Sequence, residues 1–309
     1  MTTVEAWNRG FSADALGDVA ALWNRSARTR HAFFPWTGDL LYRRWRDAGR
    51  FDPLDLIAAR DDDGELVGIA HVSAVNEPFY DPAGAVEALF VRPDRRRNGI
   101  GARLLAAALK RLRGRRLGFV DFLGAWPYGP LYTTLADGSE RSGAFGAESA
   151  PLARAAGFRC VRESIVMRLD LADAILPVDP DARVSVDRRP REGGPTWLDR
   201  VFTGWRLFDH AMLDADGRLL SRAIFSRMEG VSDWVGREVY ALFGVHTPPE
   251  LRGRGYAFRN IGAVLSRLHA AGTAVVELHV YADNVPALRL YGRLGFREVA
   301  RTSMWRLTL

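Results

Sequence analysis

Apolar residues recur at helical spacing in two segments of the chain, and a short apolar run precedes each segment. In the first segment the recurring residues are Ile100, Leu104, Leu105, Ala108, Leu109 and Leu112. In the second they are Ile261, Val264, Leu265 and Leu268. This spacing predicts two amphipathic helices that each pack one face on a core. The apolar runs before them, residues 85–91 and 238–245, predict strands.

The same alternation of strand and helix patterns continues through both halves. In the first half we expect a strand over 4–11, a helix over 13–27 capped by Ser12, a helix over 37–49, two strands within 55–75 joined by a turn at Asp63-Gly64, and a strand over 117–123. In the second half we expect a strand over 182–188, a helix over 196–208, a hairpin within 210–225 and a strand over 273–280. The order of elements is thus repeated.

Two short sequences also recur, which indicates an internal duplication. Arg96 and Arg252 begin similar arginine-glycine stretches 156 positions apart, and both halves later contain a helical pattern that ends in Gly-Phe, at residues 152–158 and 290–296. We therefore predict two tandem α/β domains, each a central mixed β-sheet flanked by helices. We place the domains at residues 1–175 and 176–309, with a long insertion in the first at about 125–147.

Composition sets the broad class of protein. The 309 residues are 48% hydrophobic and 26% charged, which is ordinary for a globular protein with a real core. The chain shows no signal peptide and no apolar run long enough to span a bilayer. Cys160 is the only cysteine, so we expect a cytoplasmic protein, with Cys160 as a small buried residue.

Charge and histidine spacing exclude two further classes. The net charge is +6, but the acidic residues are interspersed with the basic ones rather than separated from a basic arm. We therefore expect no nucleic-acid partner and no membrane partner. The six histidines are scattered without metal-ligand spacing, so we expect no metal site.

The repeated Arg-x-x-Gly-x-Gly/Ala stretch carries the strongest chemical signal. Glycine allows backbone angles closed to other residues and removes a side chain that would block a ligand. Amides at the start of a helix can then converge on a phosphate group. The P-loop alternative needs Gly-Lys-Ser/Thr, which neither copy has, and the dinucleotide fingerprint lacks its third glycine here. A glycine that only starts a helix is the simplest alternative for one copy, but two copies in matching contexts favour a phosphate loop.

At this point the sequence resembles the GNAT superfamily of acyl-CoA-dependent N-acyltransferases, and in particular its tandem two-domain members of the mycothiol synthase type. The residues that carry the resemblance are "ALFVRPDRRRNGIGARLL", "FGVHTPPELRGRGYAFRNIG" and "LHVYADNVPALRLYGRLGF". The resemblance covers nearly the whole chain. It implies acetyl-CoA as the co-substrate and the primary amine of a small molecule as the acceptor.

The resemblance also assigns roles to individual residues. In the second domain it implies contacts to coenzyme A from Val245, Thr247, Arg252, Gly253, Arg254, Gly255, Tyr256, Ala257 and Asn284. In the first domain the matching positions are Leu89, Val91, Arg96, Arg97, Asn98, Gly99, Ile100 and Gly101. Tyr291 would protonate the departing thiolate as general acid, and His246 or Glu238 is a candidate for relaying the proton of the amine.

Structural alternatives exist for several of these residues. Tyr291 could be a packed helix aromatic, and Asn284 could be a helix N-cap or serve both purposes. His246 and Glu238 could each be structural.

The first half departs from the family pattern where the second half keeps it. Aligned on Gly-Phe, Tyr291 falls on Ala153 and Asn284 on Gly146. Either this copy is a structural or cofactor-binding remnant, or the insertion supplies a substitute acid such as Tyr128 or Tyr132. The rival to an enzyme is a non-catalytic acyl-CoA-binding sensor or partner-binding protein. The sequence names neither the amine nor the oligomeric state.

Overall fold

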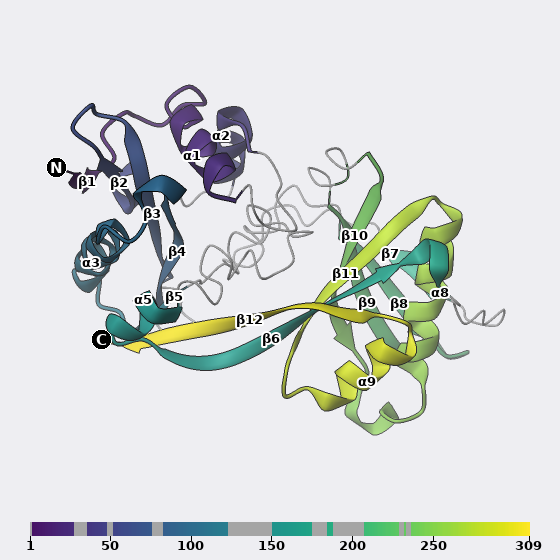
Figure 1. Cartoon of the computed structure of the whole chain (residues 1–309). Coiled ribbons are helices and arrows are strands. Elements are labelled where there is room, and N and C mark those ends of the chain that lie inside the picture. Colours follow the sequence, from purple (N-terminus) through teal and green to yellow (C-terminus); the bar gives the residue numbers. More distant parts are fainter. Residues whose placement is uncertain are drawn as a thin grey trace. The chain divides into compact units, whose positions relative to one another are not determined.

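The structure is a computed structural model of the whole chain, and it describes residues 2–27, 36–47, 52–75, 83–122, 150–174, 184–187, 207–228, 232 and 236–309. Its contacts divide the chain into two compact units. Of the described residues, those up to Glu163 and from Thr302 to Leu309 form the first unit, and Ser164 to Arg301 form the second. Figure 1 labels their elements.

The first unit is a six-stranded mixed sheet with helices. Its elements are β1 (Thr3–Ala6), α1 (Gly17–Ala27), α2 (Gly38–Asp47), the 3₁₀ turn η1 (Pro53–Asp55), β2 (Leu56–Arg60), β3 (Leu66–Val75), β4 (Ala83–Val91), η2 (Pro93–Arg95), α3 (Ile100–Arg113), β5 (Phe119–Phe122) and α5 (Ala150–Ala155). The sheet order is β1-β2-β3-β4-β5, followed by the end of β12 (Arg297–Thr308). Only β4 and β5 pair in parallel; the other neighbours are antiparallel.

The second unit repeats this plan. Its elements are the end of β6 (Arg159–Asp170), η3 (Leu171–Asp173), β7 (Val184–Asp187), β8 (Leu207–Leu213), β9 (Leu219–Arg227), β10 (Glu238–His246), η4 (Pro249–Leu251), α8 (Tyr256–Ala270), β11 (Thr273–Tyr281), α9 (Val285–Arg293) and the start of β12. The sheet order is β6-β11-β10-β9-β8-β7, with β10 and β11 parallel. Each unit is thus a mixed sheet flanked by helices, as predicted.

The two amphipathic helices hold the cores together. All six apolar residues predicted to face the core from α3 are buried in the first unit. Ile261, Val264 and Leu265 of α8 are fully buried in the second unit, and Leu268 packs against them. Each fully buried aliphatic side chain contributes about 1.5–3 kcal/mol, so these faces fix the helices on their sheets.

The terminal strands are exchanged between the repeats. The end of β6, which follows the first Gly-Phe, pairs with β11, whereas the end of β12, which follows the second, pairs with β5. Figure 1 shows the yellow end of β12 beside β5. The packing units therefore divide within β6, before residue 175; the division of the sequence into repeats at 175/176 stays a prediction.

Most predicted elements are present with shorter bounds. The strand expected over 4–11 ends at Ala6, and the helix expected from residue 13 begins at Gly17 after a turn in which Ser12 Oγ accepts from Ala15 N–H at 3.1 Å. The helix expected over 196–208 is wrong at residues 207 and 208, which belong to β8; residues 196–206 lie outside the described part.

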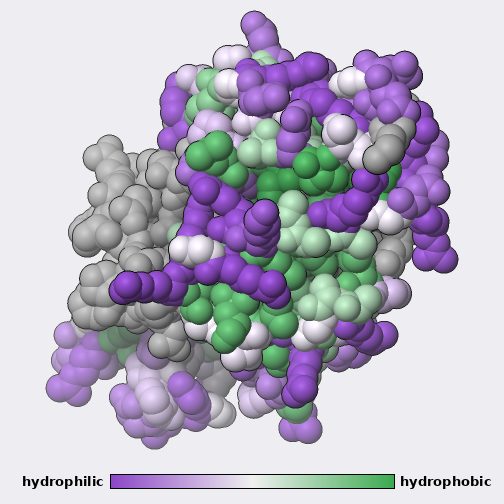
Figure 2. Space-filling model, turned by 90° about the vertical axis from the view of Figure 1, so that its left-hand side faces the viewer, coloured by the Kyte–Doolittle hydropathy of each residue, from purple (hydrophilic) through white to green (hydrophobic). Residues whose placement is uncertain are grey.

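Surface positions show one further error of prediction. Cys160 is exposed rather than buried, because it lies in the first part of β6, where residues 159–163 are all exposed and burial begins only at Ile165. Figure 2 looks onto the first unit from the side of β1 and α3 and shows apolar residues gathered between charged ones.

Candidate active site

The two arginine-glycine loops share one backbone conformation. Gly99 and Gly255 precede α3 and α8 with φ angles of 72° and 80°, in the left-handed region. Two positions earlier, Arg97 and Gly253 have φ angles of 66° and 77°. A left-handed conformation costs a residue with a side chain roughly 1–2 kcal/mol, so the first loop carries strain at Arg97 that Gly253 avoids. Both repeats therefore build the same loop.

The loop of the second unit presents unused backbone donors. The first N–H to bond inside α8 is that of Arg259, which donates to Gly255 O at 3.0 Å. The N–H groups of Tyr256, Ala257 and Phe258 have no acceptor within the helix, and they lie at its positive end. A Cβ added at Gly255 would meet no protein atom within 4 Å, so a ligand can approach the backbone. This arrangement fits a phosphate group.

The same donors are present in the first unit. Arg103 N–H is the first to bond inside α3, to Gly99 O at 3.1 Å, which leaves the amides of Ile100 and Gly101 without helical acceptors. Asn98 donates to Arg95 O at 3.4 Å. A Cβ at Gly101 would lie 3.5 Å from Leu152, so this glycine also allows close packing on α5.

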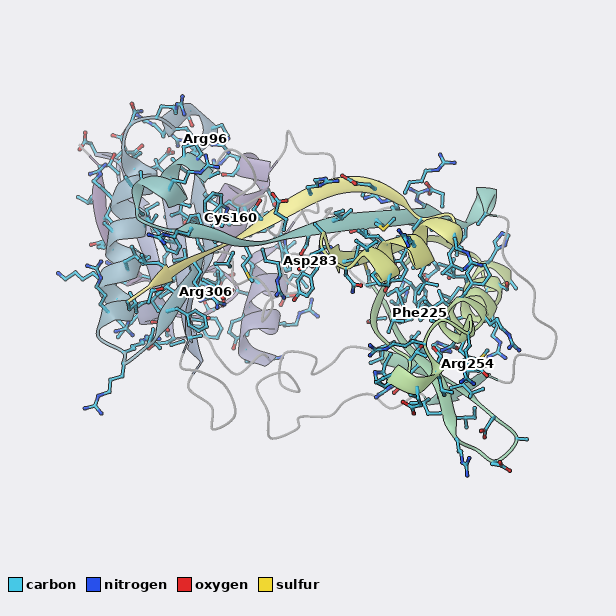
Figure 3. The ribbon with its side chains drawn as sticks, turned by 90° about the horizontal axis from the view of Figure 1, so that it is seen from below. Arg96, Cys160, Phe225, Arg254, Asp283 and Arg306 are labelled. Atoms are coloured by element: carbon cyan, nitrogen blue, oxygen red, sulfur yellow. The ribbon has the colours of Figure 1, made fainter. Side chains whose placement is uncertain are left out.

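The leading arginine of each loop clamps the loop to the preceding strand. Arg96 donates from Nε to Val91 O and from Nη2 to Ser26 O, both at 3.1 Å. Arg252 donates from Nε to Thr247 O at 3.3 Å. These bonds to carbonyl oxygens give both arginines a structural task that the sequence analysis did not foresee. In Figure 3, Arg96 marks the first loop, and Arg254 lies exposed on the second.

The central parallel strands pair over only part of their length. In the second unit the pairing of β10 with β11 ends at Leu242 and Leu278, after which β10 continues beside β9 and β11 beside β6. The register of β10 shifts between Phe243 and His246, where Gly244 has a φ of 63°. The chain thus has an unpaired strand edge leading into the loop, which an extended amide-containing arm can use as a neighbouring strand would.

The parallel strands of the first unit pair in the equivalent register. The described pairing of β4 with β5 extends to Val86 and Phe122, each 156 positions before its counterpart, and Phe122 is the last residue described before position 150. Leu89 and Val91, which continue β4 into the loop, are buried in the core, and Val245 packs partly buried in the second core. Because the side chains of Leu89, Val91 and Val245 pack in the cores, only the backbone groups of these residues remain to bind a ligand.

Tyr291 lies near the end of α9 and is largely buried. Its side chain belongs to the core cluster of the second unit and meets the Phe296 ring edge-on at 5.9 Å between centroids. Burial raises the pKa of its hydroxyl to about 12. The hydroxyl therefore keeps its proton at neutral pH, as a general acid must before it donates.

The first repeat has an alanine in the same structural position. Phe296 N–H donates to Tyr291 O at 3.0 Å, and Phe158 N–H donates to Ala153 O at 3.0 Å. The glycine in each turn is left-handed, at 92° for Gly295 and 89° for its counterpart. Ala153 is fully buried and offers no proton. The alignment of Tyr291 with Ala153 is therefore confirmed by the helix ends themselves.

Asn284 caps α9. Its Oδ1 accepts from Ala287 N–H at 3.3 Å, and the side chain is exposed. The structural alternative for this residue is thus present, and a contact to coenzyme A stays a prediction.

His246 and Glu238 lie at opposite ends of β10. Each is four residues from Leu242, where the strands diverge, or about 13 Å along the strand. Arg227 holds Glu238 with two bonds of 2.8 Å. His246 is exposed at the loop end. The two side chains thus lie apart, so only one of them can take up the proton of a given amine. Tyr128 and Tyr132, the substitutes considered for the first repeat, lie outside the described residues.

Sequence reasoning missed a buried polar contact beneath the second loop. Asn260 is fully buried in α8, and its Nδ2 donates to His210 O of β8 at 3.2 Å. The matching residue in the first repeat is Leu104, in the core. A polar residue at a core position of an amphipathic helix was the available signal. The bond fixes the first turns of α8 against the sheet.

The matching of the two loops and of the two parallel strand pairs agrees with comparison to known proteins. The model of the acetyltransferase (GNAT) family matches residues 19–127 and again residues 183–296. The chain belongs to the GNAT acetyltransferase family. As a GNAT protein it carries two copies of the family domain.

Related sequences span most of this GNAT chain. A mycothiol acetyltransferase of Clavibacter sepedonicus is 33% identical over 306 residues, which are 93% of this chain and 90% of the relative. A mycothiol acetyltransferase of Thermomonospora curvata is 33% identical over 269 residues, covering 79% and 80%.

Solved structures share the fold at lower identity. A tandem GNAT protein from the clavulanic acid biosynthesis pathway has a TM-score of 0.68 at 18% identity, over 100% of this chain and 98% of the other. A GCN5-related N-acetyltransferase from Sphaerobacter thermophilus has a TM-score of 0.66 at 17% identity, over 99% and 95%. In the described part of this GNAT chain, no helix is long and apolar enough to cross a membrane.

Proposed function

We propose that this GNAT protein is a cytoplasmic acetyl-CoA-dependent N-acetyltransferase whose second repeat carries the reaction. The observation that carries the proposal is the difference between two otherwise matching sites. Both repeats have the loop and a parallel strand pair in the equivalent register, but only the second has a hydroxyl, that of Tyr291, where the first has Ala153.

The residues of the second repeat fit coenzyme A. The amides of residues 253–257 would hold the pyrophosphate, with Arg252 keeping the loop on its strand. The unpaired edge at the end of β10 and just beyond it, from Val245 to Thr247, would bond the amides of the pantetheine arm, and the cap residue Asn284 lies at the start of α9.

The chain's contribution to the chemistry is chiefly positioning and one proton. An acceptor amine in its neutral form makes a bond to the acetyl carbonyl carbon as the carbon–sulfur bond breaks, and its nitrogen loses one further proton to give the amide. Tyr291 donates its proton to the departing thiolate, and solvent restores that proton. Glu238 or His246 would take the proton from the amine through water, because neither reaches the point of strand divergence directly.

The acceptor is proposed to be a small molecule with a primary amine. The support is the name of the relatives, mycothiol acetyltransferase, which match 79% and 93% of this chain. The identity of the amine is not part of the proposal, since acceptor pockets are built by variable loops. The first repeat, with its matching loop, would retain a weaker coenzyme A site.

The test is release of thiol from acetyl-CoA with a panel of small amines. Tyr291→Phe keeps the ring and removes the hydroxyl, so turnover should fall by about 10²–10⁴-fold while acetyl-CoA affinity stays within twofold. Normal turnover in the variant would remove Tyr291 from the mechanism. Acetyl-CoA binding without turnover for any amine in the panel would instead favour the non-catalytic acyl-CoA-binding protein.

A further inference from the structure

A cation–π pair joins the helix of Tyr291 to the helix of the second loop. The guanidinium carbon of Arg293 lies 4.6 Å from the centroid of the Phe258 ring. Arg293 is the last residue of α9. Phe258 is the third residue of α8, and this helix begins directly after the loop glycine Gly255. The pair therefore lies beside the N–H groups proposed to hold the pyrophosphate.

The geometry leaves the guanidinium facing solvent on a fixed support. Phe258 is half-buried and packs against the core of the second unit, whereas Arg293 is exposed. Tyr291 and Arg293 are two positions apart, roughly 200° around the helix, so one side chain enters the core as the other leaves it. The ring restrains the arginine beside the first turn of α8 rather than letting it sweep through solvent.

The charge of Arg293 is not neutralised within the described residues, since it forms no ion pair there. The first loop differs in this respect. There Arg92 binds Glu65 at 2.7 Å and Asp94 at 2.8 Å, and Arg95 binds Asp61 at 3.2 Å. Arg92 and Arg95, two of the cations beside the first loop, are thus bound to carboxylates.

The pair itself is also absent from the first repeat. Counted from the loop, Phe258 corresponds to Ala102; counted from Gly-Phe, Arg293 corresponds to Ala155. Both the ring and the guanidinium are thus replaced by methyl groups. In the first repeat the neighbouring Arg154 of α5 lies over a different ring, that of Trp305 on β12, at 5.1 Å. The pair that joins the Gly-Phe helix to the loop helix is therefore a feature of the second repeat.

We propose that Arg293, held on Phe258, binds the phosphate monoester on the ribose of coenzyme A and so makes the second repeat prefer coenzyme A to dephospho-coenzyme A. This inference rests on the proposed function of the second loop. The pyrophosphate and the pantetheine arm are common to both ligands, so loop and strand contacts cannot distinguish them. The ribose phosphate is the only difference, and a planar guanidinium bonds such a group through two oxygens.

The experiment is calorimetric titration of the full chain with coenzyme A and with dephospho-coenzyme A. It uses the Gly99→Val background, in which the first loop is impaired, and wild-type protein alongside. The unaltered second site should bind coenzyme A about five- to tenfold more tightly. Arg293→Gln should bring that ratio below about twofold by weakening coenzyme A alone, and Phe258→Leu should lower it in part.

The matched control is Arg289→Gln. Arg289 is an exposed arginine one turn earlier on α9, so its loss changes net charge equally without touching the ring. This variant should keep the full ratio. Arg254→Gln, in the loop itself, should weaken both ligands alike.

Three outcomes would overturn the inference. A ratio near one in the unaltered second site, or a ratio that Arg293→Gln leaves intact, refutes it while coenzyme A binding stands. An equal loss of ratio in Arg289→Gln would show that general charge, not Arg293, sets the preference. If the folded wild-type protein binds neither ligand, the proposed function fails together with this inference. Failure of the inference alone is recognised because coenzyme A still binds.

Discussion

Arg306 holds Asp121 across 185 residues of sequence with two hydrogen bonds, Nε to Oδ1 at 2.7 Å and Nη2 to Oδ2 at 2.9 Å. Arg168 likewise holds Glu277 in the second unit with two hydrogen bonds, but both go to one oxygen, from Nε at 3.2 Å and from Nη2 at 2.9 Å to Oε2. Arg168 and Arg306 are equivalent when counted from Gly-Phe, and the two carboxylates are equivalent when counted from the loops. Each repeat therefore supplies the arginine that holds the other's carboxylate, in the same strand register (Figure 3 labels Arg306).

Removing either arginine should destabilise the protein. Arg306→Ala leaves the carboxylate of Asp121 partly buried without this partner, at a cost of about 2 kcal/mol, and Arg168→Ala should cost more because Glu277 is almost fully buried. Urea unfolding measures both. Arg301→Ala is the control, since Arg301 and Glu298 are both exposed; it should change the free energy of unfolding by less than about 0.5 kcal/mol. Equal effects in all three variants would contradict this ranking.

A chain that ends at Arg301 should lose protection in the first unit only. The missing segment contains Trp305, a buried member of the first core, and the residues that pair with β5. Amide hydrogens of Phe119–Phe122 should exchange markedly faster, whereas β11 keeps its pairing with β6 and serves as the internal reference. The exchange of strands would be wrong if β11 lost protection and β5 did not.

The local features of the two repeats could be predicted from sequence, because each rests on residues close together in the chain. The core faces of α3 and α8, the two glycine loops and the Gly-Phe helix ends are of this kind. They depend on helical periodicity and on glycine at left-handed positions, which a sequence displays directly.

The exchange of β6 and β12 could not be predicted in this way. Arg168 and Arg306 occupy equivalent places in similar strands, so each could pair with the carboxylate of either repeat, and nothing local chooses between them. The helix expected to reach Phe208 failed for a related reason, since a short apolar run fits a strand or a buried helix equally well. Burial of Asn260 depends on packing against His210, 50 residues away.

Valine at the two loop glycines should separate folding from function. Gly99→Val and Gly255→Val each place a side chain at a left-handed position with no protein atom within 4 Å of the added Cβ, so both should cost about 1–2 kcal/mol of stability. Only Gly255→Val should also weaken acetyl-CoA binding at the second loop, by at least tenfold, and remove most turnover. Calorimetric titration and thiol release measure these effects.

The outcome of that pair assigns the catalytic repeat. If Gly99→Val alone silences the enzyme, the reaction belongs to the first repeat, and Tyr128 and Tyr132 become the first residues to change to phenylalanine. Substantial turnover in Gly99→Val with none in Gly255→Val keeps the assignment to the second repeat.

Acid should destabilise the protein over a pH range that is set partly by two buried histidines, His71 and His210. Burial lowers the pKa of His71 to about 3, and burial together with nearby Arg267 lowers that of His210 to about 4, against the weaker opposing effect of Asp209. Unfolded histidines bind protons at a pKa of about 6.5, so the unfolded state takes up more protons as the pH falls from 6.5 toward 4. The stability linked to each histidine is thus present above pH 6.5 and decreases below it, by roughly 2 kcal/mol at pH 5.

His210→Gln should flatten the fall in unfolding free energy between pH 6.5 and 4, measured by urea unfolding at each pH. His269→Gln, at an exposed position of α8, is the matched control and should leave the slope unchanged; an unchanged slope in His210→Gln would show that this histidine takes up its proton in the folded state.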